Sequence, residues 1–264
     1  MRTMAGSPSH RWTGSGGWRA EGPWVATVPS MPTVRVNGIT MYYEEHGAGE
    51  PLLLINGLGA DITLLAPLIS WFARSHRVVA FDNRGAGRTD KPDAPYTIEL
   101  MASDTAALME ALALEHVNVL GISMGGRVAL ELALSYPDRV RRLVLVSTSA
   151  GGRGKVTLSW PMRLLLPLKW VGPLRGEYPQ PRYAFRRQRQ ASASYDATGR
   201  LGDIRVPALI LHGRRDRSMP VEFAERMRAG IPGSRAELFR GGHMFFLFAE
   251  RQRFLERAGR FLDE

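Results

Sequence analysis

The sequence predicts an α/β protein with an eight-stranded, mostly parallel sheet flanked by helices. From residue 33 onward, short β-branched or apolar runs alternate with longer segments of helical period, as in repeated βα units. Asn37-Gly38 joins the first two runs and suits the positive φ angles of a tight hairpin, so we expect the sheet to start antiparallel. The 264 residues, 44% of them hydrophobic, are enough for one sizeable core.

The alternation places each expected element. We expect strands at residues 33–36, 39–45, 52–56, 77–82, 117–120, 143–147, 208–212 and 236–239. Helical spacing covers residues 62–74, 98–112, 127–134, 221–229 and 251–262. In the last of these helices the apolar residues share one face and the Arg and Glu residues share the other, so the apolar stripe should pack on the core.

Two segments depart from this pattern. Residues 151–202 contain four prolines between positions 161 and 179 and lack a convincing strand, so we expect a cap or lid inserted between core segments 31–150 and 203–264. Because it joins two central strands, this insertion should lie over the end of the sheet where α/β proteins bind ligands. Residues 1–30 are rich in Gly, Ser, Pro and Arg without periodicity, so we expect a disordered tail, and Met31 looks like a natural start.

Composition and charge exclude several classes of protein. Without cysteine the chain has no disulfide, thiolate metal site or Cys nucleophile. No apolar run of membrane-spanning length and no signal-like h-region occur, so we expect a cytoplasmic protein without stable membrane insertion. The net charge is +10, and residues 153–200 hold ten Lys or Arg against two acids. Such a localised excess argues against general nucleic-acid binding and indicates one basic patch.

A strand, a tight turn and a helix follow one another around Ser123. The strand at 117–120 leads into Gly121-Ile122-Ser123-Met124-Gly125 and then a helical run, which is the pattern of a nucleophile elbow. Side chains at Gly121 and Gly125 would collide as strand and helix close together. Ser123 should therefore stand exposed at a helix N-terminus, where backbone amides can stabilise a developing oxyanion.

A serine hydroxyl needs a base, and histidine suits that role near neutral pH. His243 follows the last strand in a Gly-Gly-His loop and can reach Ser123. The other five histidines lie in the tail (His10), at the opposite end of the sheet (His46, His76, His116) or in a structural position (His212). Asp216, in the loop after the penultimate strand, is the expected acid that orients His243, whereas its rival Asp203 precedes that strand. The order Ser, Asp, His matches the hydrolase order.

Together these motifs resemble the α/β-hydrolase superfamily across residues 31–264, and most closely its small bacterial carboxylesterases and 3-oxoadipate enol-lactonase-like hydrolases. The resemblance extends to the stretch from Phe81 to Asp90. It implies that the backbone amides of Leu58 and Met124 form the oxyanion hole. The family's usual His-Gly after the third strand reads Asn56-Gly57 here, and we expect Asn56 to preserve the loop through side-chain hydrogen bonds.

The expected reaction is hydrolysis of carboxylic esters with short to medium acyl chains through an acyl-enzyme, without cofactor or metal. The glycines and arginines of residues 82–90 lack a dinucleotide fingerprint, and no histidine has metal-ligand spacing. Apolar cap residues, among them Trp160, Leu164 and Leu165, are expected to wall the acyl pocket.

Several alternatives stay open. The same triad could hydrolyse enol-lactones or carbon-carbon bonds or perform perhydrolysis, and a non-catalytic ligand receptor would keep the same fold. The basic cap could be a solvated face, attract acidic substrates, or rest on a lipid surface through Lys155, Arg163, Lys169 and Arg175. The physiological substrate and the oligomeric state do not follow from the sequence.

Overall fold

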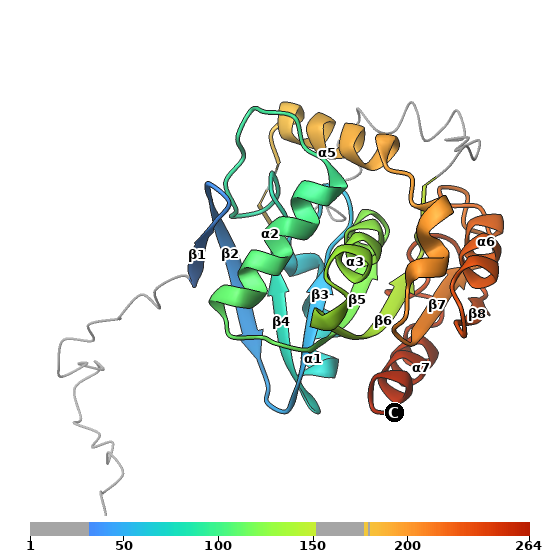
Figure 1. Ribbon diagram of the computed structural model, residues 1–264. Coiled ribbons are helices and arrows are strands. Elements are labelled where there is room, and N and C mark those ends of the chain that lie inside the picture. Colours follow the sequence, from blue (N-terminus) through green and yellow to red (C-terminus); the bar gives the residue numbers. More distant parts are fainter. Residues whose placement is uncertain (1–31, 152–176, 179) are drawn as a thin grey trace, which may run out of the picture. The chain divides into compact units, whose positions relative to one another are not determined.

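The computed structural model describes residues 32–151, 177, 178 and 180–264. Their strands form one eight-stranded sheet in the order β1-β2-β4-β3-β5-β6-β7-β8, which confirms the predicted fold class (Figure 1). The strands are β1 (Thr33–Val36), β2 (Ile39–His46), β3 (Glu50–Ile55), β4 (His76–Phe81), β5 (Val117–Ile122), β6 (Val140–Val146), β7 (Ala208–Gly213) and β8 (Arg235–Phe239).

Strand direction places the loops that matter for function. β2 pairs antiparallel with both β1 and β4, and every other neighbouring pair is parallel. Asn37 and Gly38 form the first hairpin turn with φ angles of 44° and 76°, as their sequence predicts. The loops that follow β3, β4, β5, β6, β7 and β8 therefore meet at one edge of the sheet.

Helices cover both faces of the sheet because alternate strand residues point to opposite sides. Leu53 and Ile55 of β3 belong to a core shared with α2 (Ile98–Ala111), α3 (Met124–Ser135) and α6 (Glu222–Gly230). Leu52 and Leu54 belong to a second core shared with α1 (Ala66–Phe72) and α7 (Arg251–Leu262). Short 3-10 helices lie at Ile62–Leu65, Pro137–Arg139 and Thr198–Asp203. None of the described helices has the length and apolarity that a membrane span needs.

One helix has no counterpart among the predicted elements. Helix α5 (Arg182–Ser194) lies within the stretch that we expect to form a cap or lid. Its buried side chains are Ala184, Gln188 and Ala191, so the face it packs on the core carries almost no hydrophobic signal. This face differs from the stripes of large apolar residues by which the other helices were predicted.

Helix α5 lies across the loops at the end of the sheet (Figure 1). The Tyr183 hydroxyl donates to the Lys91 carbonyl at 2.7 Å, and Arg187 pairs with Asp93 at 3.1 Å, so the helix contacts the loop after β4.

The proposed boundaries of the tail and the cap stay predictions. Outside the described residues lie the tail residues 1–31, the apolar cap residues Trp160, Leu164 and Leu165, and the cap cations Lys155, Arg163, Lys169 and Arg175.

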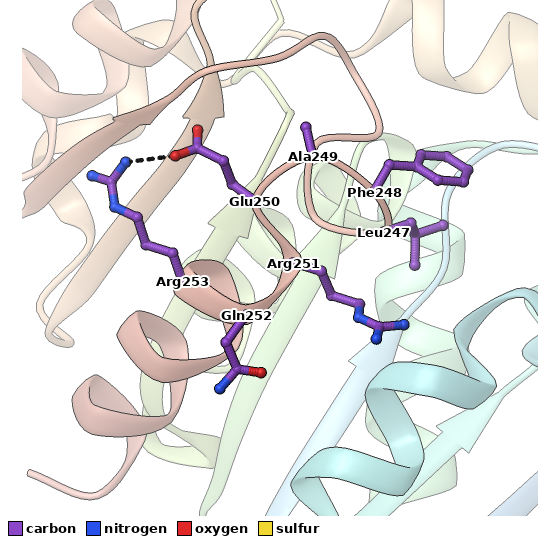
Figure 2. Close-up of a pocket in the computed structure, with 7 residues that line it drawn as sticks. All are labelled: Leu247, Phe248, Ala249, Glu250, Arg251, Gln252 and Arg253. Atoms are coloured by element: carbon purple, nitrogen blue, oxygen red, sulfur yellow. Dashed lines mark hydrogen bonds and ion pairs between the residues drawn. The ribbon is translucent and has the colours of Figure 1, made fainter.

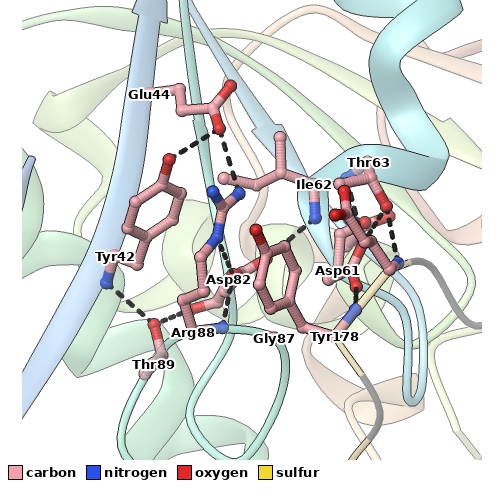
Figure 3. Close-up of polar contacts among 12 residues, drawn as sticks. Tyr42, Glu44, Asp61, Ile62, Thr63, Asp82, Gly87, Arg88, Thr89 and Tyr178 are labelled. Carbon is pink, nitrogen blue, oxygen red and sulfur yellow. Dashed lines mark hydrogen bonds and ion pairs between the residues drawn. The ribbon is translucent and has the colours of Figure 1, made fainter. Parts of the chain in front are cut away.

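The loop after β4 is held by a buried polar network (Figure 3). Asp82 is fully buried and accepts hydrogen bonds from the backbone amides of Ile62 and Arg88, each at 2.8 Å. Burial raises the pKa of this carboxyl. The Arg88 guanidinium lies 3.5 Å from the ring centre of Tyr42 and 4.5 Å from that of Tyr178. The network therefore joins β2, the β4 loop and the residues that lead to α5, which agrees with a structural use of this loop.

We expect that breaking the buried ion pair between Arg84 and Asp104 strongly destabilises the fold. Arg84 donates two hydrogen bonds of 2.7 Å to Asp104, and both side chains are buried. Asp104→Asn leaves the guanidinium without a counter-charge, so urea unfolding should show a loss of about 3–5 kcal/mol. As a control, Glu50→Gln removes the exposed partner of Arg141 and should cost less than about 1 kcal/mol. Equal losses in the two variants would contradict this assignment.

The contacts of Glu131, on helix α3, should make the free energy of unfolding depend on pH. Burial alone would raise the pKa of Glu131, but hydrogen bonds from Arg200, Ser135 and Tyr195 outweigh it and lower the pKa below 4.5. A lowered carboxyl pKa stabilises the fold above the unfolded-state pKa, and this stabilisation is lost as pH falls through the folded-state pKa.

At pH 7, we expect Glu131→Gln to cost about 1.5–3 kcal/mol in urea unfolding, the usual range for hydrogen bonds to a charged group. The difference from the wild type should narrow as the pH falls below about 4.5. A difference that stays constant from pH 7 to acid would show that the charge of Glu131 contributes nothing.

Candidate active site

Ser123 occupies a strained turn between β5 and α3. Its φ of 55° and ψ of −117° lie outside the regions that non-glycine residues favour, at a cost of about 1–3 kcal/mol. A side chain at Gly121 would collide with the Gly125 carbonyl, and one at Gly125 would collide with the Ile55 carbonyl. Both glycines are therefore needed for the close approach of strand and helix, as the motif predicts.

The structure brings Ser123, His243 and Asp216 into one hydrogen-bonded chain. His243 Nε2 lies 3.0 Å from Ser123 Oγ, and His243 Nδ1 lies 2.7 Å from Asp216 Oδ2. An ionised carboxylate only accepts hydrogen bonds, so Nδ1 carries the proton and Nε2 is free to accept the serine proton. This is the arrangement that a triad requires before it reacts.

The Asp216 side chain is fully buried and held in place by its own loop. Its Oδ1 accepts the backbone amides of Ser218 and Met219, each at 2.8 Å, which leaves Oδ2 for His243. The buried His212 fixes the same loop from below, because its Nε2 donates to the Met219 carbonyl at 2.7 Å. Burial lowers the pKa of His212, so this imidazole stays neutral and structural, as expected.

The loop that carries His243 is held at both of its ends. The Ser147 hydroxyl donates to the His243 carbonyl at 2.8 Å. Just beyond His243, Phe245 stacks on Phe239 of β8 with ring centres 4.5 Å apart and meets Phe254 of α7 edge-on at 5.9 Å. Aromatic packing of this kind stabilises beyond the area it buries. The backbone that carries the His243 imidazole is therefore held firmly, despite the two glycines that precede it.

Three further histidines of the described residues lie where they cannot act as the base. His76 begins β4, His116 precedes β5, and His46 ends the antiparallel strand β2, so all three lie at the opposite end of the sheet. His10 lies outside the described residues. The rival acid Asp203 ends the 3-10 helix before β7 and is exposed there, away from the triad.

The loop after β3 lies against the nucleophile. A side chain built at Gly57 would approach Ser123 Oγ to 3.9 Å. The backbone amides of Leu58 and Met124 follow Gly57 and Ser123 directly, and no acceptor among residues 32–151, 177, 178 and 180–264 binds either of them. Both N–H groups are therefore available to an oxyanion.

Buried amide side chains hold this loop. Asn56 Nδ2 donates to the Asp61 carbonyl at 2.6 Å, so Asn56 does preserve the loop through its side chain. Asn83 Nδ2 donates to the Asn56 carbonyl at 3.0 Å, which ties the loop to the one after β4. Asn83 lies in the stretch from Phe81 to Asp90, but its sequence does not indicate this role, because the contact spans two separate loops.

Arg127, one turn beyond Ser123, was also missed. Its guanidinium donates to Ser149 Oγ at 2.8 Å and to Ser192 Oγ at 3.0 Å, so it joins α3 to the end of β6 and to α5. Burial lowers its pKa, and no carboxylate pairs with it among the described residues. A lone Arg within a buried, apolar helix was the signal in the sequence that could have indicated this contact.

A separate cavity of about 460 Å³ lies at the start of α7 and is lined by residues 247–253 (Figure 2). It contains no side chain of the triad, so it is not the place where Ser123 would react. In the part of the chain that the structure describes, no three His, Asp or Glu side chains are grouped to hold a metal ion. The expectation that no cofactor is needed stays a prediction.

Comparison with known proteins gives the same superfamily. The family model for the alpha/beta hydrolase fold matches residues 50–169. The chain is 31% identical over 250 residues to the 2-hydroxy-6-oxo-2,4-heptadienoate hydrolase of Pseudomonas putida, covering 80% of this chain and 88% of that one. It is 29% identical over 225 residues to the poly(3-hydroxyalkanoate) depolymerase of Ectopseudomonas oleovorans, covering 75% and 79%.

A solved structure extends this likeness to three dimensions. The enol-lactonase from Burkholderia xenovorans LB400 superposes with a TM-score of 0.76 at 25% identity, covering 88% of this chain and all of that one. Fold, element order and sequence relatives therefore agree. The chain belongs to the α/β-hydrolase superfamily.

Proposed function

We propose that this protein is a serine esterase that hydrolyses carboxylic esters with short to medium acyl chains. The observation that carries the proposal is the hydrogen-bonded chain from Ser123 through His243 to Asp216, at 3.0 and 2.7 Å. It lies beside two free backbone amides, those of Leu58 and Met124, which suit the oxyanion of an acyl-transfer reaction.

The geometry implies a two-step reaction. Ser123 Oγ attacks the ester carbonyl carbon while its proton passes to His243 Nε2, and the carbonyl oxygen, now negative, accepts the Leu58 and Met124 amides. The carbon-oxygen bond to the alcohol breaks as His243 returns the proton to the leaving alkoxide. Water then attacks the acyl-enzyme with His243 as base, which releases the acid and restores Ser123. Asp216 stabilises the imidazolium in both steps.

Two further points favour esters. A serine nucleophile attacks a carbonyl and forms a neutral acyl-enzyme, and a poly(3-hydroxyalkanoate), the polymer in the name of one relative, is itself a polyester. We propose that apolar cap residues, including Trp160, Leu164 and Leu165, wall the acyl pocket. The reaction needs neither metal nor cofactor in this scheme.

A second candidate is hydrolysis of a lactone or of a carbon-carbon bond on the same triad. It is favoured by two comparisons, with the 2-hydroxy-6-oxo-2,4-heptadienoate hydrolase and with the enol-lactonase. A panel of alkyl esters, lactones and carbon-carbon substrates separates the candidates, because the class hydrolysed with the highest kcat/KM identifies the reaction.

We expect the purified protein to hydrolyse p-nitrophenyl esters from acetate to medium chain lengths, with palmitate the poorest. Ser123→Ala should lower kcat by about 10⁶-fold, since removing a triad nucleophile leaves only binding and the oxyanion hole. The rate of p-nitrophenol release measures the chain-length preference and the effect of the substitution. If the wild type and Ser123→Ala are equally inactive on every ester, the esterase proposal fails, and lactones and carbon-carbon substrates are tested next.

We expect Asp216→Asn to lower kcat by about 10⁴-fold with little change in folding, because an amide favours the wrong imidazole tautomer. The matched control is Asp203→Asn, which makes the same change at an exposed carboxylate outside the triad and should leave kcat unchanged. Steady-state kinetics on p-nitrophenyl butyrate compare the two. Similar activity in both variants would rule out Asp216 as the orienting acid.

A further inference from the structure

Gln188 is a buried polar side chain that the triad does not explain. It lies on α5 with 0% of its surface exposed, and both ends of its amide are occupied. Its Oε1 accepts the Gly59 backbone N–H at 3.0 Å, and its Nε2 donates to the Arg84 carbonyl at 2.8 Å. The Gly59 amide can only donate and the Arg84 carbonyl can only accept, so the partners determine the orientation of the Gln188 amide.

Asn56 closes the loop that Gln188 holds by donating to the Asp61 carbonyl, but the turn inside this loop has only a weak backbone hydrogen bond. Gly59 has a φ of 71°, a conformation that glycine adopts without strain but does not enforce. The turn's own hydrogen bond, from the Ala60 N–H to the Gly57 carbonyl, is 3.4 Å long and exceeds the usual range of about 2.7–3.2 Å. Contacts from outside the turn therefore add to its order.

Leu58 lies between two such contacts. On one side Gly57 packs against Ser123, and on the other the Gly59 N–H is bound by Gln188. Helix α5 also packs closely against Gly59, since a side chain built at Gly59 would come within 2.9 Å of the Phe185 ring. Fixing the peptide units on both sides of Leu58 restricts the direction of the Leu58 N–H.

We propose that Gln188 is a positioning residue that aims the Leu58 N–H at the oxyanion, so that α5 completes the oxyanion hole of the core. This inference rests on the proposed function, in which Leu58 supplies one of the two oxyanion donors. Gln188 does not touch the substrate. Its loss should lower the rate of acyl transfer for every ester alike and leave ground-state binding unchanged.

Two substitutions separate positioning from simple packing. Gln188→Met keeps the volume but removes both hydrogen bonds. Gln188→Glu places an ionised oxygen against the Arg84 carbonyl at high pH, whereas the protonated acid restores both bonds, with its C=O accepting from Gly59 and its O–H donating to Arg84.

The charged groups on the adjoining loops are identical in all variants. Arg84 is paired with Asp104, and Asp61 and Asp82 accept backbone amides. Activity expressed as a ratio to the wild type at each pH therefore isolates the titration of the introduced carboxyl. Gln190→Glu is the matched control, because it adds the same charge at an exposed position of the same helix.

The experiment measures kcat and KM for p-nitrophenyl acetate and butyrate from pH 8 to pH 5, together with thermal unfolding midpoints. Gln188→Met should lower kcat by roughly 10- to 100-fold at unchanged KM, less than the 10² to 10³ caused by removing an oxyanion donor. Gln188→Glu should be similarly impaired at pH 8 and recover relative to the wild type as the pH falls, whereas Gln190→Glu should match the wild type throughout.

A fluorophosphonate supplies a readout that does not depend on ester turnover, because Ser123 displaces fluoride from phosphorus while the phosphoryl oxygen occupies the oxyanion hole. The rate at which the fluorophosphonate labels Ser123 should fall in the same variants, and in the same order, as kcat. If the wild type is labelled but hydrolyses no ester, the esterase proposal fails while this inference is still tested by labelling. A wild-type kcat in Gln188→Met, a loss confined to KM, or a pH-independent ratio for Gln188→Glu overturns the inference.

Discussion

The positive φ at Ser123 is the constraint on which the candidate site depends. It exposes the hydroxyl at the end of β5 and at the N-terminus of α3, and it is compatible with the fold only because Gly121 and Gly125 let the helix approach the sheet. The strain of about 1–3 kcal/mol is held by buried packing on both faces of the sheet. An alanine at Gly125 would push α3 off β3 and with it move the Met124 amide.

The other parts of the site reach Ser123 from the same edge of the sheet. Six strands run parallel around it, and their following loops supply Leu58, Asp216 and His243. Each loop is fixed by contacts that do not react, namely amide side chains for the first, His212 for the second and stacked phenylalanines for the third. Geometry of this kind places donors and acceptors before the reaction starts, which is the largest source of rate acceleration in acyl transfer.

Much of this was predictable from the sequence, for reasons that differ by residue. Strands buried on both faces read as apolar runs, and Ser123 was recognisable because its turn demands glycine at defined positions. His243 and Asp216 followed from chain order and from the direction of parallel strands. Helix α5 was not predicted, since it buries Ala184, Gln188 and Ala191 rather than a stripe of large apolar residues. The roles of Asn83 and Gln188 depend on contacts between distant segments, which no local pattern records.

We propose that Ser123 carries the acyl group during turnover. The most direct test lets the protein react with a p-nitrophenyl ester and stops the reaction with acid. The protein is then digested, and the mass of the peptide that contains Ser123 is measured. We predict that this peptide gains one acyl group in the wild type and that Ser123→Ala gains none. An acyl group found on another residue, with Ser123 unmodified, would contradict this proposal.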